Sequence, residues 1–211
     1  MSAHSFKKRL SENAFFVVLL LALGLIGVQV WQFRAGSRRA QYAEAIQRTR
    51  MLKDSFLRVG ANSPIEDKAD FAGLAYFAPD PAYRYQLGYQ PEPEGSSVWL
   101  GSTKGARQPY LRAGSAILEV RGYKRQVYLF KALGPGAGNQ LLLPFADSTS
   151  GNSTYVVGRY LDVAPPQGGT VELDFNQAYH PYCAYSDEYA CPIPPPENRL
   201  QVGIYAGERI K

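Results

Sequence analysis

Residues 116–131 read AILEVRGYKRQVYLFK, and this stretch decides the fold class. Two apolar runs flank Gly122, an arrangement typical of two antiparallel strands joined by a tight turn. Residues 98–101 and 108–112 form a second such pair around Lys104. The middle of the chain is therefore predicted to be a series of β-hairpins.

The surrounding sequence continues the strand pattern. Tyr83, Tyr85, Leu87 and Tyr89 alternate with polar or small residues, and this period of two is that of a β-strand. The 20 Gly and 15 Pro suit short strands joined by tight turns. We expect a mainly β domain, an antiparallel barrel or sandwich, preceded by a single transmembrane helix and a short helical stalk. Further apolar runs lie at residues 140–145, 154–163, 170–175 and 200–206.

Residues 14–28 form an apolar run without a polar side chain, AFFVVLLLALGLIGV. Counted on to Trp31, the run has 18 residues. As a helix it would be about 27 Å long, at about 1.5 Å per residue, close to the roughly 30 Å of a hydrocarbon core. A cleaved signal peptide would need a small-residue cleavage site, and GVQVWQFRAG offers a poor one. We therefore expect a retained transmembrane anchor at residues 14–33, after a basic tail at residues 1–13.

Basic residues lie on both sides of this anchor. Three Lys or Arg residues precede it, and five follow within about 20 residues. The positive-inside rule alone would keep the C-terminal domain in the cytoplasm. Long domains cross largely regardless of charge, however, and a short basic tail before an apolar run is the usual layout of a signal anchor. We favour a single-pass protein of the cell inner membrane with its C-terminal domain on the extracytoplasmic, periplasmic side.

The net charge of +5 is concentrated beside the anchor. Residues 32–58 alone carry +5, and the chain after them carries −2. A nucleic-acid-binding domain needs a basic face, so this distribution argues against nucleic acid as a partner and for the lipid bilayer. Apolar residues recur every three or four positions through 37–58, which predicts a helix, either a partner-binding stalk or a helix packed on the domain's own sheet. The predicted stalk covers residues 34–60, and the β-rich domain covers residues 61–211.

Established catalytic motifs are missing from the sequence. The two His residues are His4, in the N-terminal tail, and His180. The sequence holds no G-x-S-x-G elbow, H-E-x-x-H pair or EF-hand loop. Carboxylates and Tyr can also serve as acid or base, so an unrecognised enzyme stays open. We assign no catalytic residues, no metal and no cofactor.

Polar residues gather in two turn-rich segments, 145–162 and 174–198. Asp, Ser and Thr in such segments bond their own backbone and shape turns. Alternatively, the two segments converge to bind a small polar or anionic ligand, for which Arg159 would supply a bidentate contact. The candidate ligand-binding residues are Asp147, Thr149, Arg159, Asp174, Asn176, Tyr179, His180, Glu197 and Asn198.

Cys183 and Cys191 lie in the second of these segments. A structural disulfide suits two cysteines of an exported domain and would add roughly 2–3 kcal/mol of stability by closing a short loop. A metal site that includes His180 is the second possibility, although H-x2-C-x7-C is not a standard zinc pattern. The third is a reactive or redox thiol. Of the three, the disulfide is our prediction.

The most specific signature of the chain consists of three C-terminal stretches. They are FADSTSGNSTYVVGRYLDV at 145–163, LDFNQAYHPYCAYSDEYACPIPPPENRL at 173–200 and AGER at 206–209. These stretches resemble a widespread prokaryotic family catalogued as a conserved domain of unknown function. The resemblance extends over roughly residues 54–211 and implies one β-rich domain without an established activity. The family pattern has Asn where this chain has His180, and G-G-G-R-Y where this chain has VVGRY, so it does not imply a mechanism through His180.

The anchor, the basic stalk and the missing motifs favour one function. We expect a non-enzymatic, membrane-anchored accessory or interaction subunit whose partner is another membrane protein or complex. The alternative is a small polar-ligand-binding module or an unrecognised enzyme, with its site formed by residues 145–162 and 174–198.

Overall fold

The computed structural model describes residues 3–93, 96–133 and 138–211, with side chains from Leu21 onward except at Ala22. The chain divides into two compact units, Met1–Glu44 and Ala45–Lys211, and each is described by itself. Helix α1 (Ala3–Val59) begins in the first unit and ends in the second.

In the first unit, helix α1 exposes large apolar side chains. Leu25, Trp31 and Phe33 are each more than three-fifths exposed. Within the part of the chain whose side chains are described, no helical segment is long and apolar enough to cross a membrane. Much of the predicted anchor, residues 14–20 together with Ala22, lies outside those described side chains.

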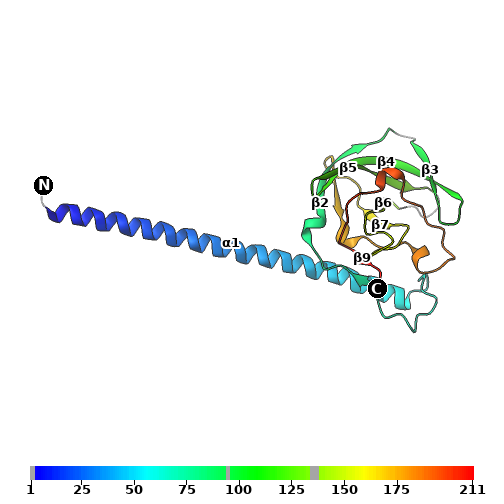
Figure 1. Cartoon of the computed structure of the whole chain (residues 1–211), viewed down its shortest axis with the longest axis horizontal. Helices are drawn as coiled ribbons and strands as arrows, with labels where there is room; N and C mark the ends of the chain where they lie inside the picture. Colours follow the sequence, from blue (N-terminus) through cyan, green and yellow to red (C-terminus); the bar gives the residue numbers. More distant parts are fainter. Residues whose placement is uncertain (1–2, 94–95, 134–137) are drawn as a thin grey trace. The chain divides into compact units, whose positions relative to one another are not determined.

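The second unit is built on one curved antiparallel sheet, a half-barrel (Figure 1). Its strands and short 3-10 helices are β1 (Ala75–Tyr76), η1 (Pro81–Tyr83), β2 (Arg84–Pro91), β3 (Ser97–Gly101), β4 (Arg107–Val120), β5 (Tyr123–Ala132), β6 (Leu141–Phe145), β7 (Arg159–Val163), β8 (Thr170–Asp174), η2 (Phe175–Gln177), η3 (Tyr182–Ala184), η4 (Pro196–Asn198) and β9 (Glu208–Arg209). The strand order is β7-β6-β5-β4-β2-β8, and β3 pairs with β4 beside this path. The prediction of a mainly β, antiparallel domain is confirmed, and β1 with β9 forms a separate two-stranded sheet.

The central hairpin forms as the sequence predicts. Arg121 and Gly122 connect β4 to β5 with φ values of 50° and 81°, and positive φ at both central residues characterises a type I′ turn. Strand β4 joins two runs that the sequence analysis treats as separate strands, with a change of register between Arg112 and Gly114. A β-bulge of this kind lets one long strand bend, which the curvature of a half-barrel requires.

The C-terminal part contains less regular structure than predicted. Residues 154–158 form no strand, and neither do residues 200–206, although Ile204 and Ala206 are fully buried. The carbonyls of Ile204 and Ala206 accept hydrogen bonds from the Arg159 guanidinium instead of from a neighbouring strand. A buried side chain therefore satisfies backbone groups that a sheet would otherwise satisfy.

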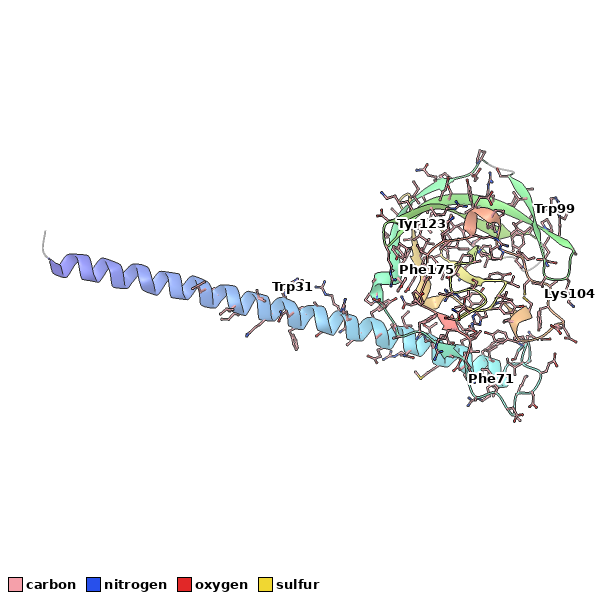
Figure 2. The ribbon with its side chains drawn as sticks, in the orientation of Figure 1. Trp31, Phe71, Trp99, Lys104, Tyr123 and Phe175 are labelled. Atoms are coloured by element: carbon pink, nitrogen blue, oxygen red, sulfur yellow. The ribbon has the colours of Figure 1, made fainter. Side chains whose placement is uncertain are left out.

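The main hydrophobic core collects side chains from β2, β4 to β8 and the C-terminal segment. Phe145 and Phe175 pack edge to face with ring centroids 5.1 Å apart, and Phe175 lies in the interior of the domain (Figure 2). Leu143, Leu173 and Ile204 have no exposed surface. Each such side chain stabilises the fold by about 1.5–3 kcal/mol relative to exposure.

The last turns of α1 belong to the domain. Ile46 and Leu57 are buried, and so is Arg50, whose Nη1 donates to the Phe77 carbonyl at 2.9 Å. The compact unit accordingly begins at Ala45, inside the stretch that the sequence analysis assigns to the stalk. For these turns the structure has a helix packed on its own domain, one of the two interpretations of the 37–58 pattern.

Candidate functional site

A buried carboxylate joins three distant parts of the second unit. Glu208 in β9 has no exposed surface. Its Oε2 forms a salt bridge with Lys53 Nζ of α1 at 2.8 Å, and its Oε1 accepts from His180 Nδ1 at 3.0 Å. The Tyr185 hydroxyl also donates to Oε1, and the His180 amide donates to Oε2 at 3.2 Å. Four donors therefore occupy the acceptor positions of this carboxylate.

These contacts fix the protonation of the cluster. Burial alone would raise the pKa of Glu208, but the hydrogen bond from His180 and the charge of Lys53 outweigh burial and lower that pKa to about 2. Burial raises the pKa of Tyr185, and the negative charge of Glu208 raises it further. At neutral pH Glu208 is therefore an ionised carboxylate, and Tyr185 is a neutral hydrogen-bond donor.

His180 forms a hydrogen bond through each ring nitrogen. Nδ1 donates to Glu208, and Nε2 accepts from the Tyr155 amide at 3.2 Å. A neutral imidazole has one donor and one acceptor nitrogen, so both are used within the protein. A general base needs a lone pair within reach of a substrate proton, and His180 offers none in this arrangement.

A cavity of about 300 Å³ borders the Glu208 cluster. Tyr155, His180 and Tyr185 contribute to its wall from the two segments that the sequence analysis singled out. The rest of the wall comes from residues 65–75 and 208–211, which lie outside the two turn-rich segments. The cavity is thus assembled from four segments that are remote in sequence.

Sequence reasoning missed Lys53, Tyr185 and Glu208 as members of this cluster. Glu208 lies in the AGER stretch, so a signal for it was present in the resemblance. The sequence holds no comparable signal for Lys53, because its role depends on α1 packing beside β9. Its Nζ also lies 4.6 Å from the centre of the Tyr179 ring, which adds a cation–π contact to the salt bridge.

Asp147 and Arg159 meet, as the ligand hypothesis requires, but they bond to the protein itself. Arg159 is 1% exposed, and its Nη2 donates to Asp147 Oδ2 and to the Ile204 carbonyl, both at 2.7 Å. Its Nη1 donates to the carbonyls of Ala206 and Glu208. The other Asp147 oxygen accepts from the amide and hydroxyl of Thr149. This group closes a turn and holds the C-terminal segment, as the turn-chemistry interpretation expects.

Asp174, Asn176 and Asn198 also bond to nearby backbone. Asp174 caps η2 by accepting from the Asn176 amide at 3.1 Å. Asn176 exchanges hydrogen bonds with the backbone of Asp80, both at 2.8 Å. Asn198 bonds to the amide and carbonyl of Tyr128 and to the carbonyl of Pro144, each at 2.8 Å. These side chains connect segments of the fold.

The nine predicted residues are divided among different places. His180 lines the cavity of about 300 Å³, whereas Tyr179 lines one of about 340 Å³ beside α1. Glu197 lines a third, of about 190 Å³, next to Tyr128. We therefore place the candidate site at the Glu208 cluster and its cavity.

The two cysteines are free in the structure, in place of the predicted disulfide. The Cys183 amide donates to Cys191 Sγ at 3.2 Å, so the two residues are neighbours. Burial raises the pKa of the Cys191 thiol to about 12, which disfavours the thiolate that a reactive cysteine requires. Among the described residues no group of three or more His, Cys, Asp or Glu side chains is placed to hold a metal ion.

Comparison with known proteins identifies the family of the chain. Residues 69–209 match the family described as "Protein of unknown function (DUF1684)". The chain belongs to the DUF1684 family. The match contains the cavity wall at Tyr155, His180 and Tyr185, and it also contains Glu208, so the candidate site lies mostly within the family domain. Lys53 and the rest of α1 precede the match.

A solved structure shares the fold. The solution NMR structure of an uncharacterized protein from Haloarcula marismortui is 33% identical, with a TM-score of 0.64. The alignment covers 82% of this chain and 96% of that protein. None of the curated proteins compared matches the chain.

Proposed function

We propose that this DUF1684 protein is a membrane-anchored accessory subunit that presents its domain, on the extracytoplasmic side, to another membrane protein. The observation that carries the proposal is an apolar stripe on the last turns of α1. Leu52 and Val59 are 73% and 74% exposed, and Phe56 between them is 42% exposed. Positions i, i+4 and i+7 share one face of a helix, so the three side chains form one continuous strip.

This strip, Leu52, Phe56 and Val59, lies on a different side of the helix from the buried residues, and Phe56 at its edge also lines the cavity beside α1. Ile46, Arg50 and Leu57 face the domain, and that packing fixes which face of α1 is left outside. An exposed apolar strip on a packed helix is a common mark of a protein interaction site. A partner helix could cover it by the helix-packing rules that hold within one protein.

The sequence supports the membrane part of the proposal. Residues 14–28 contain no polar side chain, and the described large apolar side chains between Leu21 and Phe33 are exposed. Exposed apolar side chains along a helix suit a lipid environment. The basic residues after Trp31 suit anionic lipid headgroups.

The Glu208 cluster supports the non-enzymatic part. Its carboxylate, imidazole and lysine bond to one another or to backbone. Acid–base catalysis needs such groups to reach a substrate. Their mutual bonds favour a role in joining α1 to β9.

A pull-down from native membranes in mild detergent tests the interaction. Leu52→Glu combined with Val59→Glu should abolish recovery of a stoichiometric membrane-protein partner. The thermal midpoint should be unchanged, because both side chains are mostly exposed. Ile117→Glu is the matched control, since Ile117 is 64% exposed on β4. Recovery of the wild-type chain as a lone monomer would overturn the proposal.

Fractionation and topology mapping test the anchor. Removal of residues 1–33 should move the protein from the membrane pellet to the soluble fraction. A cysteine-accessibility assay at a residue substituted in an exposed loop, such as Lys104→Cys in a chain that also carries Cys183→Ser and Cys191→Ser, should show reaction with an impermeant reagent in intact cells. Protection of that residue until the inner membrane is opened would place the domain in the cytoplasm.

A second candidate function is a small-ligand-binding module, favoured by the cavity of about 300 Å³. Both turn-rich segments contribute to it, through Tyr155 and through His180 and Tyr185. A concave, mostly apolar site with a few convergent polar groups is the usual form of a ligand site. Filling the cavity with Ala184→Phe should abolish ligand binding without affecting the partner pull-down, which separates the two functions.

A further inference from the structure

The walls of the cavity beside Glu208 are largely apolar, and they determine which part of a ligand can be buried there. Ile65, Phe71, Leu74 and Ile210 supply large apolar side chains, and Phe71 belongs to the irregular segment that follows α1 (Figure 2). The volume of about 300 Å³ is at the small end of the roughly 300–1,000 Å³ typical of small-molecule pockets. Such walls favour a compact apolar group.

The polar groups in the cavity wall already form hydrogen bonds within the protein. Glu208 accepts four hydrogen bonds, and both ring nitrogens of His180 are bonded. The Tyr155 hydroxyl donates to the Cys183 carbonyl at 3.2 Å. A polar ligand atom placed among these groups would lose its water without gaining an equivalent partner. The buried part of the ligand is therefore apolar.

The charged side chains at the rim of the cavity indicate the charge of the exposed end of the ligand. The charge of Glu208 is neutralised by Lys53. The remaining charged side chains in the wall are those of Asp70 and of the two cations Arg209 and Lys211. All three side chains are exposed, and none forms a salt bridge within the described residues. Two cations against one carboxylate favour an anionic group at the rim.

We propose that this cavity binds a single-chain amphiphile with an anionic head group, of the medium-chain carboxylate class. The chain lies among Phe71, Leu74 and Ile210, and the head group lies at Arg209 and Lys211. The proposal rests on the second function above, ligand binding by the cavity, and does not depend on the accessory role. It replaces the polar ligand of the sequence analysis with an amphiphile, because the wall is largely apolar.

The test uses the full-length protein in lipid nanodiscs and a decanoate probe with a diazirine at the end of its chain. After irradiation, the labelled residues are mapped by mass spectrometry, and occupancy is measured by competition with unlabelled compounds. Labelling should concentrate on residues 71–75, 184–185 and 210. Decanoate should compete at least tenfold better than decyltrimethylammonium, which has the opposite charge and the same chain. Empty nanodiscs measure how much competitor partitions into lipid.

Two kinds of variant test the head-group contacts and the location of the ligand in the cavity. Arg209→Gln combined with Lys211→Gln should weaken competition by decanoate about tenfold, since each exposed ion pair contributes modestly, and should leave competition by uncharged decanol unchanged. Arg107→Gln with Arg199→Gln, at exposed sites away from the cavity, is the charge-matched control. Ala184→Phe should abolish labelling of the cavity by filling it, and a thermal melt checks that it folds.

The outcomes separate the class of ligand from ligand binding itself. Cavity labelling that decyltrimethylammonium or decanol competes as well as decanoate would overturn the anionic class while keeping the cavity as a ligand site. Labelling spread over the surface, unchanged in the folded Ala184→Phe variant, would overturn both. If the Arg209 and Lys211 variant competes like wild type, the head-group assignment is wrong.

Discussion

The hairpin region, residues 84–132, and the C-terminal region, residues 145–209, are held together in different ways. Strands β2 to β5 lie in one antiparallel ladder of regular backbone hydrogen bonds. The C-terminal region has short strands and turns. Buried Arg159 bonds to its backbone carbonyls in place of a ladder, and buried Asn198 bonds the region to the backbone of Tyr128 on β5 and Pro144 on β6. The comparison shows that an irregular backbone can be buried where polar side chains satisfy its amides and carbonyls.

The two regions should respond differently to mutation. A ladder spreads its stability over many backbone bonds, none of which a side-chain change removes. In the C-terminal region one side chain serves several backbone groups, so a single substitution leaves several buried groups without partners. The four predictions below test this contrast, in order of decreasing effect.

Arg159→Ala should have the largest effect. It would leave Asp147 buried without its ion-pair partner and would remove donors from three carbonyls. Loss of one partner of a buried pair costs about 3–5 kcal/mol, and denaturant unfolding measures it. Arg84→Ala is the control in the hairpin region, where the pair with Glu172 has side chains 47% and 42% exposed, and it should cost less than about 1 kcal/mol. Similar losses in the two variants would refute the contrast.

The acid stability of the domain should depend on Glu208. Its pKa falls from the ordinary 4.5 to about 2 on folding, so its contribution is complete above pH 4.5 and is lost as the pH falls to about 2. This pKa shift corresponds to a change on the order of 3 kcal/mol in the free energy of unfolding. Glu208→Gln should remove this part of the pH dependence of the unfolding free energy. Glu172→Gln, at an exposed site, should retain it, and an unchanged profile in Glu208→Gln would disprove the assignment.

Asn198→Ala should be next in size. Its side chain bonds to Tyr128 on β5 and to Pro144 on β6, so alanine would leave buried backbone groups unpaired. We expect a loss of about 2 kcal/mol in the unfolding free energy. Asn176→Ala, which breaks two bonds to the Asp80 backbone, should cost a comparable amount. A neutral result at both sites would mean that these bonds do not stabilise the region.

Gly122→Ala should have the smallest effect, in the turn of the hairpin region. Gly122 has φ of 81°, a conformation that costs a residue with a Cβ about 1 kcal/mol. Open space surrounds the position where a Cβ would be placed, so no clash adds to this cost. Gly122→Asn, which tolerates left-handed φ better, should lose less than Gly122→Ala. A loss as large as that of Arg159→Ala would show that the turn controls the whole sheet.

Local patterns predicted the hairpin region well. The alternation of Tyr83 to Tyr89 predicted β2, and the apolar runs on either side of Gly122 predicted part of β4 and β5. These elements follow from near neighbours in sequence, because turn residues and side-chain alternation act over a few positions. The predicted strand at residues 200–206 did not form, because a distant guanidinium took the place of a neighbouring strand.

The candidate site was predicted only in part. Asp147 with Arg159, and Asp174 with Asn176, do come together, but as fold chemistry. His180 lies at the site, while its partner Glu208 is 28 residues away in the chain, and Lys53, the other charged partner of Glu208, is 127 residues away from His180. A polar residue in a turn-rich segment looks the same in sequence whether it bonds to a ligand or to a remote carbonyl.

By itself the sequence determined the antiparallel β character of the domain, its hairpins and its membership in the DUF1684 family. Short-range rules of turns and alternation, together with the three C-terminal stretches, were enough for that. Only the tertiary structure decided that α1 joins the domain at Ala45, that Glu208 binds Lys53 and His180, and that a largely apolar cavity lies beside them. The physical reason is that burial determines the role of a polar group, and burial depends on which distant segments pack around it.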